Sequence, residues 1–459
     1  MEWINLAYLL SAVLFILGLR GLGHPDSARR GSTLAALGML VAVIATLLHK
    51  DIITYQWIII GLIAGSLIGI PMGLWIPITK MPERIALSHS FGGLAVAIVG
   101  LIKYLEHAGT GHLPRFTMGA VGFEVLLGTI TFTGSLMAFG KLQGILPSRP
   151  MLFRFQNFLN GIIFFSSLAI VATLIVDQNH LPLFNVLLCL GLLLGILFVL
   201  PIGGADMPVV ICLLNSYAGL AASATGFALE NNVLIICGAL DGGSGFILAM
   251  LMSKAMNRSF SNVLFGGFGA QRSVSAKSTS AKPVVEMSIP EATEILRAAN
   301  SVVVVPGYGL AVAQAQHVVR ELAELLEKNG TEVRYAIHPV AGRMPGHMNI
   351  LLAEANVPYE QLVEMDNINP TMETVDVCVV IGANDVVNPA ARHNKSSPIY
   401  GMPIINADKA KTVFVLKRSM ATGFAGIEND LFTFDNTRML FGDAKATIQS
   451  LITEFKSND

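Results

Sequence analysis

The stretch SVVVVPGYGLAVA (residues 301–313) decides the fold of the C-terminal part of the chain. Its four consecutive valines predict a short strand that is buried on both faces of a parallel sheet. A G-x-G-x-x-V sequence follows directly, and then an amphipathic helix is predicted to about Lys328 and a second strand from Glu332 to His338. This order is that of a βαβ unit with a dinucleotide fingerprint, so the sequence predicts a Rossmann-like α/β domain.

The glycines of this motif carry the functional interpretation. Gly307 allows the tight turn, Gly309 lets the backbone approach a pyrophosphate, and the helix N-terminus offers free N–H groups to phosphate. A structural turn without a ligand is the alternative, because a degenerate G-x-G is weak evidence by itself. The strand before the motif and the helix after it favour the nucleotide site.

Two further apolar runs, Val375 to Ile381 and Thr412 to Leu416, predict more strands of the same sheet. Each ends in a polar motif, GANDVVN (382–388) after the first and KRS (417–419) after the second. Ligands of open α/β sheets bind beyond the carboxyl ends of the strands, so both motifs are candidates for the site.

The choice between the two nicotinamide dinucleotides depends on two strand ends. NAD-binding domains commonly place an Asp or Glu at the end of the second strand, whereas here that strand ends at His338 without an acid. Lys417 and Arg418 supply adjacent cations at another strand end, which suits a 2′-phosphate. A solvated surface pair is the alternative, and the position at a strand end favours NADP(H).

The N-terminal part of the chain has a different composition. The whole chain is 53% apolar and 13% charged, against about 25% charged residues in ordinary soluble domains. Nine apolar runs, each close to the length that spans a bilayer, predict a polytopic α-helical membrane domain. The runs are 3–19, 32–48, 55–79, 84–105, 118–139, 158–176, 184–200, 207–229 and 233–253.

The distribution of Lys and Arg predicts the orientation. Residues 1–258 contain thirteen of them, ten of which follow odd-numbered spans. By the positive-inside rule the N-terminus lies outside and the C-terminal domain in the cytoplasm. We therefore expect a transmembrane domain (1–258), a Ser/Lys-rich linker (259–289) and an NADP(H)-binding domain (290–459).

Burying a polar residue inside a membrane span costs free energy, so such residues are candidates for function. His89 in the fourth span can titrate near neutral pH, with helix–helix hydrogen bonding as the alternative. Asp206 before the eighth span fits either a helix N-cap or the charged mouth of a proton path. The other candidates are Asn215, which can hold a water or orient an imidazole, and Ser135. Glu124 and Asp241 are further acids, either of which could bind a proton; a lipid headgroup or an interhelical partner is the simpler role.

Other classes of site receive no support from the sequence. Cys189, Cys212, Cys237 and Cys378 lie in apolar runs without metal-ligand spacing, which predicts neither a disulfide nor a metal site. The net charge of −1 gives no reason to expect nucleic acid as a partner. The first apolar run lacks a basic n-region and a cleavage site, so it is interpreted as a retained span.

Long strings in both halves resemble the β subunit of bacterial NAD(P) transhydrogenases along nearly the whole chain. In the membrane part they are SHSFGGLA (88–95), FTGS (132–135), GGADMPVV (203–210), LNSYAGLAA (214–222) and KAMNRSF (254–260). In the C-terminal part they are PGYGLAVAQAQ (306–316), HPVAGRMPGHMN (338–349), EMDNIN (364–369), IGANDVVNPAA (381–391), GMP (401–403), KRSMATG (417–423) and MLFGDAK (439–445).

The resemblance implies an enzyme that passes hydride between NAD(H) and NADP(H) and couples the transfer to proton translocation. It implies that this chain binds NADP(H) and that a separate α subunit binds NAD(H). We further expect a dimer of αβ units. It also implies a multi-pass protein of the bacterial inner membrane. The alternative from another class is a transporter or channel regulated by an NADP(H)-sensing cytoplasmic domain.

The resemblance also implies roles for individual residues. His89 matches the family's conserved-motif histidine and Asn215 matches its pathway asparagine, whereas Ser135 is a weaker candidate of the same kind. Asp385 matches a position near the nicotinamide that is implicated in coupling. Phe424 stands where the family usually has a tyrosine, so the hydroxyl is lost. The implied cofactor contacts are Gly307, Tyr308, Gly309, Leu310, Ala311, Val312, Ala313, Val340, Ala341, Gly342, Arg343, Met344, Pro345, Gly346, Gly382, Ala383, Asn384, Asp385, Val386, Val387, Asn388, Gly401, Met402, Lys417, Arg418, Ser419, Met420, Ala421, Thr422, Gly423, Phe424, Asp443 and Ala444.

Overall fold

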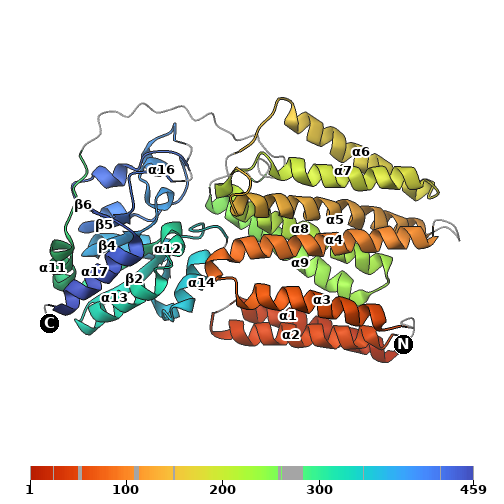
Figure 1. The fold of residues 1–459 in the computed structure, drawn as a ribbon, viewed down its shortest axis with the longest axis horizontal. Coiled ribbons are helices and arrows are strands. Elements are labelled where there is room, and N and C mark those ends of the chain that lie inside the picture. Colours follow the sequence, from red (N-terminus) through yellow and green to blue (C-terminus); the bar gives the residue numbers. More distant parts are fainter. Residues whose placement is uncertain are drawn as a thin grey trace. The chain divides into compact units, whose positions relative to one another are not determined.

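A computed structural model describes residues 2–23, 25–49, 54–107, 113–147, 150–256, 260, 283–344, 346–397, 399–423 and 425–457. The chain divides into two compact units, a helical one and a C-terminal one that contains a sheet (Figure 1). Most of the predicted linker (259–289) lies outside the described residues, so the predicted domain limits stay a prediction.

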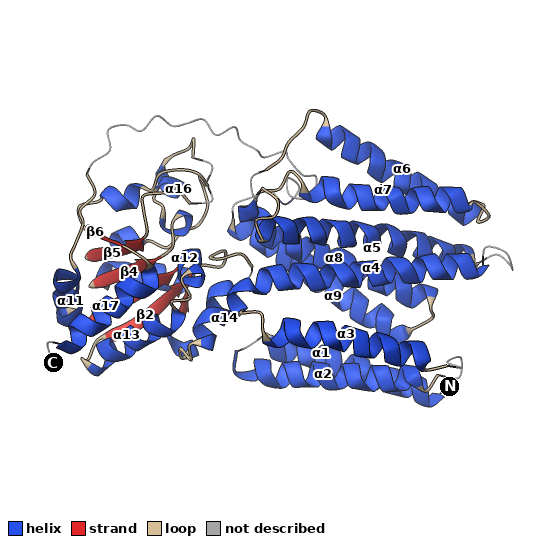
Figure 2. Ribbon diagram, in the orientation of Figure 1, coloured by secondary structure: helices blue, strands red, loops and turns tan. Residues whose placement is uncertain are grey.

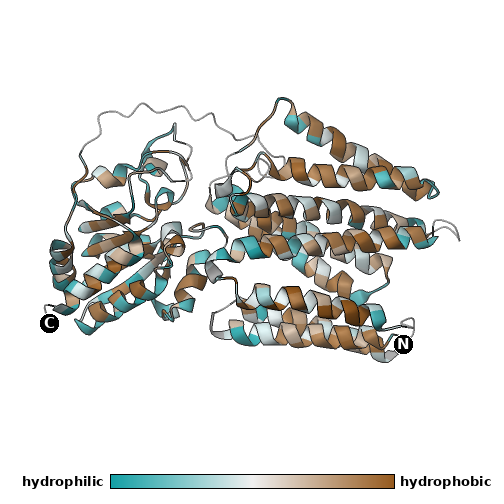
Figure 3. Ribbon diagram, viewed as in Figure 1, coloured by the Kyte–Doolittle hydropathy of each residue, from teal (hydrophilic) through white to brown (hydrophobic). Residues whose placement is uncertain are grey.

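All nine apolar runs form helices long and apolar enough to cross a membrane, within the part of the chain that the structure describes. The ribbons of these helices are coloured mostly brown, that is hydrophobic, in Figure 3. This confirms the prediction of a polytopic helical domain. The helices are α1 (Glu2–Leu22), α2 (Pro25–Leu47), α3 (Gln56–Leu74), α4 (Met81–His107), α5 (Arg115–Leu142), α6 (Gln156–Val176), α7 (Leu181–Val199), α8 (Met207–Ala228) and α9 (Asn232–Ala255), with short 3-10 turns η1 (Ile78–Lys80) and η2 (Gly204–Asp206).

α5 and α8 form the centre of the bundle. In the most apolar 18-residue stretch of each of these helices, 67% is buried. α5 packs closely on α4 because small residues line the contact. A Cβ added at Gly93 of α4 would lie 2.9 Å from the carbonyl oxygen of Gly128 of α5. Small residues let two backbones approach in this way in membrane bundles, where dispersion and close packing replace the hydrophobic effect.

Lys141 joins the end of α5 to the end of α7. Its buried ammonium group donates to the carbonyl oxygens of Val199 (3.1 Å), Leu200 (2.5 Å) and Ile202 (2.7 Å). The last carbonyls of a helix have no partner within the helix, so a cation there satisfies them and complements the helix dipole. Lys141 is one of the positive charges behind the predicted orientation, and it also has this structural role.

The C-terminal unit is a six-stranded parallel sheet with strand order β3-β2-β1-β4-β5-β6 (Figure 2). β1 lies between β2 and β4, with Val304 paired to Tyr335 on one side and to Val379 on the other. The predicted α/β class and the four predicted strands are confirmed, whereas β3 and β6 were not predicted. The strands are β1 (Ser301–Pro306), β2 (Glu332–Ile337), β3 (Leu362–Glu364), β4 (Val377–Ile381), β5 (Thr412–Lys417) and β6 (Thr437–Phe441).

Helices cover this sheet, and its valine-rich strands are buried among them. The first helix begins with a capping box, in which the Ser288 side chain accepts from the Glu291 N–H while the Glu291 carboxylate accepts from the Ser288 N–H. The helices are α11 (Ile289–Ala298), α12 (Tyr308–Val312), α13 (Gln316–Lys328), α14 (His347–Glu354), α15 (Met365–Ile368), α16 (Ala390–His393) and α17 (Ala444–Ser457), with 3-10 turns η3 (Tyr359–Gln361), η4 (Asn369–Thr374), η5 (Asp385–Val387), η6 (Ala407–Lys409) and η7 (Asp430–Thr433).

The single helix predicted after the glycine motif is wrong, because α12 ends at Val312 and α13 begins at Gln316. Two hydrogen bonds end α12: Ala315 N donates to the Leu310 carbonyl and Gln314 N to the Ala311 carbonyl, both at 3.1 Å. With Gln314 at a φ of 48° these bonds form a Schellman motif. This end is usually marked by glycine, and the glutamine hides it in the sequence.

Candidate functional site

The loops that follow β1 and β4 meet at the point where the strand order of the sheet reverses. From β1 the chain continues to β2 on one side, and from β4 it continues to β5 on the other. Gly307 N donates to the Ile381 carbonyl and Gly309 N to the Gly382 carbonyl, each at 2.9 Å. This reversal is the topological switch point, at which open α/β sheets bind their ligands.

Glycine is required on both sides of this crossing. A Cβ added at Gly307 would lie 2.4 Å from the Cα of Ala383, and one added at Gly382 would lie 2.4 Å from the Cα of Gly309. Gly382 also has a φ of 65°, in the left-handed region. The G-x-G motif therefore serves the contact between the two loops, in addition to the role predicted for it toward a pyrophosphate.

Replacement of Gly382 by alanine is expected to destabilise the C-terminal domain by about 2–4 kcal/mol, because left-handed strain and overpacking add. The measurement is the denaturant concentration at which this domain is half unfolded, detected by proteolysis of the full chain. Gly330→Ala is the matched control, since Gly330 has a φ of 89° but no atom within 4 Å of its added Cβ. Equal losses of stability in the two variants would contradict the conclusion that the close contact between the two loops requires glycine at Gly382.

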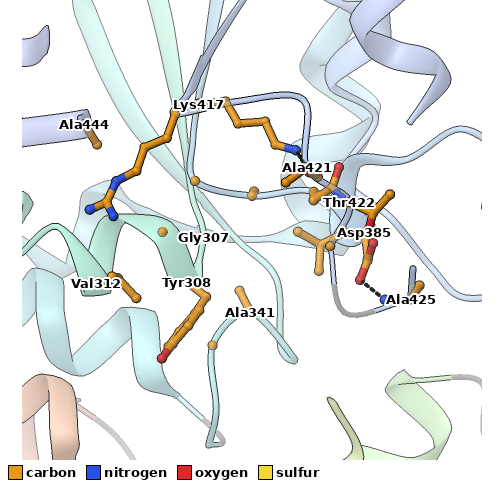
Figure 4. Close-up of a pocket in the computed structure, with 18 of the residues that line it drawn as sticks. Gly307, Tyr308, Val312, Ala341, Asp385, Lys417, Ala421, Thr422, Ala425 and Ala444 are labelled. Carbon is orange, nitrogen blue, oxygen red and sulfur yellow. Dashed lines mark hydrogen bonds between the residues drawn. The ribbon is translucent and has the colours of Figure 1, made fainter. Parts of the chain in front are cut away.

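A pocket opens above the carboxyl ends of β1, β4 and β5, and Figure 4 shows the side chains around it. It brings together most of the predicted cofactor residues, although they come from six separate stretches of sequence. The predicted residues that line it are Gly307, Tyr308, Gly309, Val312, Ala313, Val340, Ala341, Gly342, Gly382, Ala383, Asn384, Asp385, Val386, Met402, Lys417, Arg418, Ser419, Ala421, Thr422, Gly423 and Ala444.

Some predicted cofactor residues do not line the pocket. Leu310, Ala311, Val387 and Asn388 are buried in the domain, and Asn388 is used structurally, since its amide donates to the Glu428 carbonyl at 3.0 Å. Pro345 and Phe424 lie outside the described residues. The others that do not line it are Arg343, Met344, Gly346, Gly401, Met420 and Asp443. Among the described residues from 283 to 457, the lining residues missed in the sequence are Ile399, Leu416, Ala425 and Gly442.

The two predicted phosphate contacts lie at the end of β5. Lys417 Nζ donates to the Ala421 carbonyl and lies 5.0 Å from the centre of the Phe432 ring. Burial lowers the pKa of Lys417, and the Asp385 carboxylate opposes this effect. Arg418 donates to Asp443 at 2.8 Å with 62% of its side chain exposed. A guanidinium has five N–H donors, so this ion pair leaves capacity for a phosphate.

The loop after β4 is held by the segment that follows β5. Asp385 Oδ2 accepts from Ala425 N at 2.9 Å (Figure 4), and Asn429 Nδ2 donates to the Asn384 carbonyl at 3.0 Å. Asn384 Nδ2 is buried and has no hydrogen-bond partner among the described residues. A Cβ added at Gly423 would lie 2.6 Å from this nitrogen, so glycine leaves it facing the pocket.

Two predicted cofactor loops contact each other through an arginine and a tyrosine. The Arg343 guanidinium lies 4.4 Å from the centre of the Tyr308 ring, a cation–π contact. Arg343 N donates to His347 Nδ1 at 3.0 Å. The hydrogen bond from Arg343 N to His347 requires the tight turn at Gly342, whose φ is 109°. The loop after β2 is therefore placed beside the glycine motif.

Two buried histidines should make this domain sensitive to acid. Burial lowers the pKa of His338 to about 4, and burial together with the Arg343 guanidinium lowers the pKa of His347 to about 4. Because the unfolded value is about 6.5, the neutral rings stabilise the domain fully above pH 6.5, and this stability is lost as the pH falls toward 4. We expect a loss of about 3 kcal/mol per histidine. A denaturant midpoint that stays constant from pH 7 to pH 4.5 would contradict this.

In the membrane helices, the predicted polar residues form two contacts. His89 Nδ1 of α4 lies 3.1 Å from Ser135 Oγ of α5, and Asn215 Nδ2 of α8 donates to Asp241 Oδ1 of α9 at 3.0 Å. Asp241 also interacts electrostatically with His89, whose Nε2 is buried without a hydrogen-bond partner among the described residues. Asp241 thus has the interhelical partner considered for it. Asp206 lies in η2, immediately before α8.

The described residues contain no group of three or more His, Cys, Asp or Glu side chains that could hold a metal ion. Nine membrane-length helices and a parallel sheet with a switch-point pocket together define a polytopic membrane protein that carries a dinucleotide-binding type of domain.

Comparison with known proteins gives the family. A sequence model described as NAD(P) transhydrogenase beta subunit matches residues 4–454. The NAD(P) transhydrogenase subunit beta of Rhodospirillum rubrum is 48% identical over 453 residues, which cover 97% of each chain, and the protein of that name from its strain ATCC 11170 matches equally. This chain belongs to the NAD(P) transhydrogenase beta subunit family. The resemblance found in the sequence motifs is confirmed.

Proposed function

We propose that this chain binds NADP(H) and couples hydride transfer between NAD(H) and NADP(H) to proton movement across the membrane, together with an α subunit that binds NAD(H). The observation that carries the NADP(H) assignment is the pair Lys417 and Arg418 at the switch-point pocket. The second strand, β2, ends at Ile337 and is followed by His338, whose buried Nε2 lies 2.8 Å from the Pro403 carbonyl oxygen. The residue at this strand end is therefore not an acid that could bind a ribose 2′-hydroxyl.

The residues around the pocket fit the parts of NADP(H). Lys417 and Arg418 would hold the 2′-phosphate, and the loop from Gly307 to Ala313 would face the pyrophosphate. Asp385 and Asn384 would lie toward the nicotinamide, where the buried Asn384 amide has a donor to offer. The bound cofactor supplies the hydride chemistry, so the protein needs to provide orientation and exclusion of water, with no side-chain acid or base.

Coupling would operate through protonation in the bundle. A proton on His89 would change the interactions with Ser135 and with Asp241, and it would bias the NADP(H) domain between binding and transfer-competent states. We further propose a dimer of αβ units in the bacterial inner membrane, with the N-terminus outside and the C-terminal domain in the cytoplasm. The positive-inside distribution of Lys and Arg supports this orientation.

The test is reduction of an NAD analogue by NADPH in membrane vesicles that contain this chain, with and without the α subunit. A pH-sensitive dye reports proton movement in the same vesicles. Transfer that requires both subunits and acidifies or alkalises the lumen is expected. Ion or solute flux that responds to NADP(H), without any hydride transfer in the presence of the α subunit, would indicate a regulated transporter instead.

A further inference from the structure

We propose that Glu124 is a second proton-binding site of the membrane domain, at the opposite end of the α4–α5 contact from His89. The inference rests on the proposed function, because it assigns a new residue to the same proton movement. It concerns a carboxyl group in the middle of the bundle that neither the His89–Ser135 contact nor the Asn215–Asp241 contact includes.

Glu124 has no exposed surface, and neither of its carboxyl oxygens has a hydrogen-bond partner among the described residues. The facing helix leaves room for it at a glycine, since a Cβ added at Gly100 of α4 would lie 2.5 Å from Glu124 Oε1. Its neighbours Val121 and Val125 on α5 belong to the buried apolar cluster of the bundle. An ionised carboxylate is strongly disfavoured in such surroundings, so the neutral, protonated form is favoured at rest.

The hydroxyl of Thr225 on α8 does not satisfy this carboxyl group. Thr225 Oγ1 donates to the Ala221 carbonyl of its own helix at 3.1 Å. Both carboxyl oxygens of Glu124 are thus left without a hydrogen bond among the described residues.

The position of Glu124 places it in line with the predicted proton pathway. On α5, residues 124, 128, 131 and 135 recur at helical spacing and share the face toward α4. Ser135 meets His89 at one end of this face, Glu124 meets Gly100 at the other, and the buried Thr131 hydroxyl between them has no hydrogen-bond partner among the described residues. Gly100 is eleven residues beyond His89, which corresponds to about 16 Å along the helix axis.

Few ionisable groups lie on the helices around Glu124. On α4, Tyr104 is one turn beyond Gly100, and its hydroxyl donates to the Gln178 carbonyl at 2.7 Å. No described ion pair includes Glu124. The ionisable side chains of the neighbouring helices are Glu83, Arg84, His89, Lys103, Tyr104, Glu106 and His107 on α4, Arg115 and Lys141 on α5, Cys189 on α7 and Cys212 and Tyr217 on α8; α6 has none.

The step itself is a proton exchange. Glu124 releases its proton to the path toward His89 or to the aqueous phase on its own side, and it takes another up from the other direction. With the predicted orientation, Glu124 lies in the outer half of the membrane and His89 in the cytoplasmic half. Two protonatable groups in series would allow each to exchange with one aqueous phase only.

The test uses the complete complex with the α subunit in proteoliposomes. Glu124→Gln keeps the size of the side chain and removes the proton site, and we expect at least a tenfold loss of dye-detected proton movement and of coupled transfer. Glu124→Asp should restore part of both. Glu106→Gln, which changes an exposed carboxyl on the same end of α4, should behave as the wild type.

A spectroscopic readout separates proton binding from a packing role. Infrared difference spectra between the NADP⁺ and NADPH forms should contain a protonated-carboxyl band that shifts in D2O and is absent in Glu124→Gln. The inference is overturned if Glu124→Gln moves as many protons per hydride as the wild type. It is also overturned if the difference spectrum of Glu124→Gln is the same as that of the wild type. If the wild type itself moves no protons, the proposed function fails instead.

Discussion

His89→Ala is expected to abolish proton pumping by the complex with the α subunit, with a loss of at least about 10²-fold, the scale for removal of a proton-transfer group. An imidazole ordinarily titrates near neutral pH. Nδ1 of His89 lies 3.1 Å from Oγ of Ser135 on the neighbouring helix. Alanine leaves Ser135 without this partner and leaves no group to accept the proton. The measurement is dye quenching in vesicles during reduction of an NAD analogue by NADPH.

The binding of NADP(H) by the C-terminal domain should be unchanged in the same variant, because His89 belongs to the helical unit. His107→Ala is the matched control: His107 ends the same helix, and its Nδ1 lies 3.0 Å from the Lys103 carbonyl of its own helix. Full pumping by His89→Ala would end the assignment. Equal loss in the two variants would point to damage of α4.

The double substitution Lys417→Ala and Arg418→Ala is expected to lower the preference for NADPH over NADH by about 10²-fold. Each charge-assisted hydrogen bond to a phosphate contributes about 1.5–3 kcal/mol, and the exposure of Arg418 places its share at the lower end. NADH lacks the 2′-phosphate, so its affinity should change little. Titration of the nucleotide fluorescence with the full chain gives both affinities.

Raising the salt concentration should weaken NADPH binding to the wild type more than to this double variant, because the removed contacts are ionic. Lys411→Ala serves as the control, since Lys411 lies just before the amino end of β5 and pairs with Asp376 at 2.7 Å, away from the pocket. If the affinities for NADPH and NADH fell together, the pair would have a structural role and the NADP(H) assignment would lose its main support.

The sequence predicted most of the site because the switch-point pocket is built from short local motifs. The glycine motif, GAND (382–385) and Lys417-Arg418 each follow a buried apolar strand, and parallel strands bring their carboxyl ends to one edge. Gly442, Leu416, Ile399 and Ala425 were missed, since small and apolar residues in a loop or strand give no chemical signal. β3 has only three residues and β6 contains an arginine, so neither has the apolar run of a buried strand.

By itself the sequence determined the nine spans and the class of the C-terminal domain. The length of an apolar run must match the bilayer, and a valine-rich run suits a strand that is buried on both faces. Each requirement can be recognised from the sequence of one segment without knowledge of the others. Only the tertiary structure decided that Gly382 crosses Gly309, that Asn215 bonds to Asp241 and that Glu124 faces Gly100 without a partner. These contacts join residues distant in the chain, so they depend on how helices and loops pack, which no local pattern encodes.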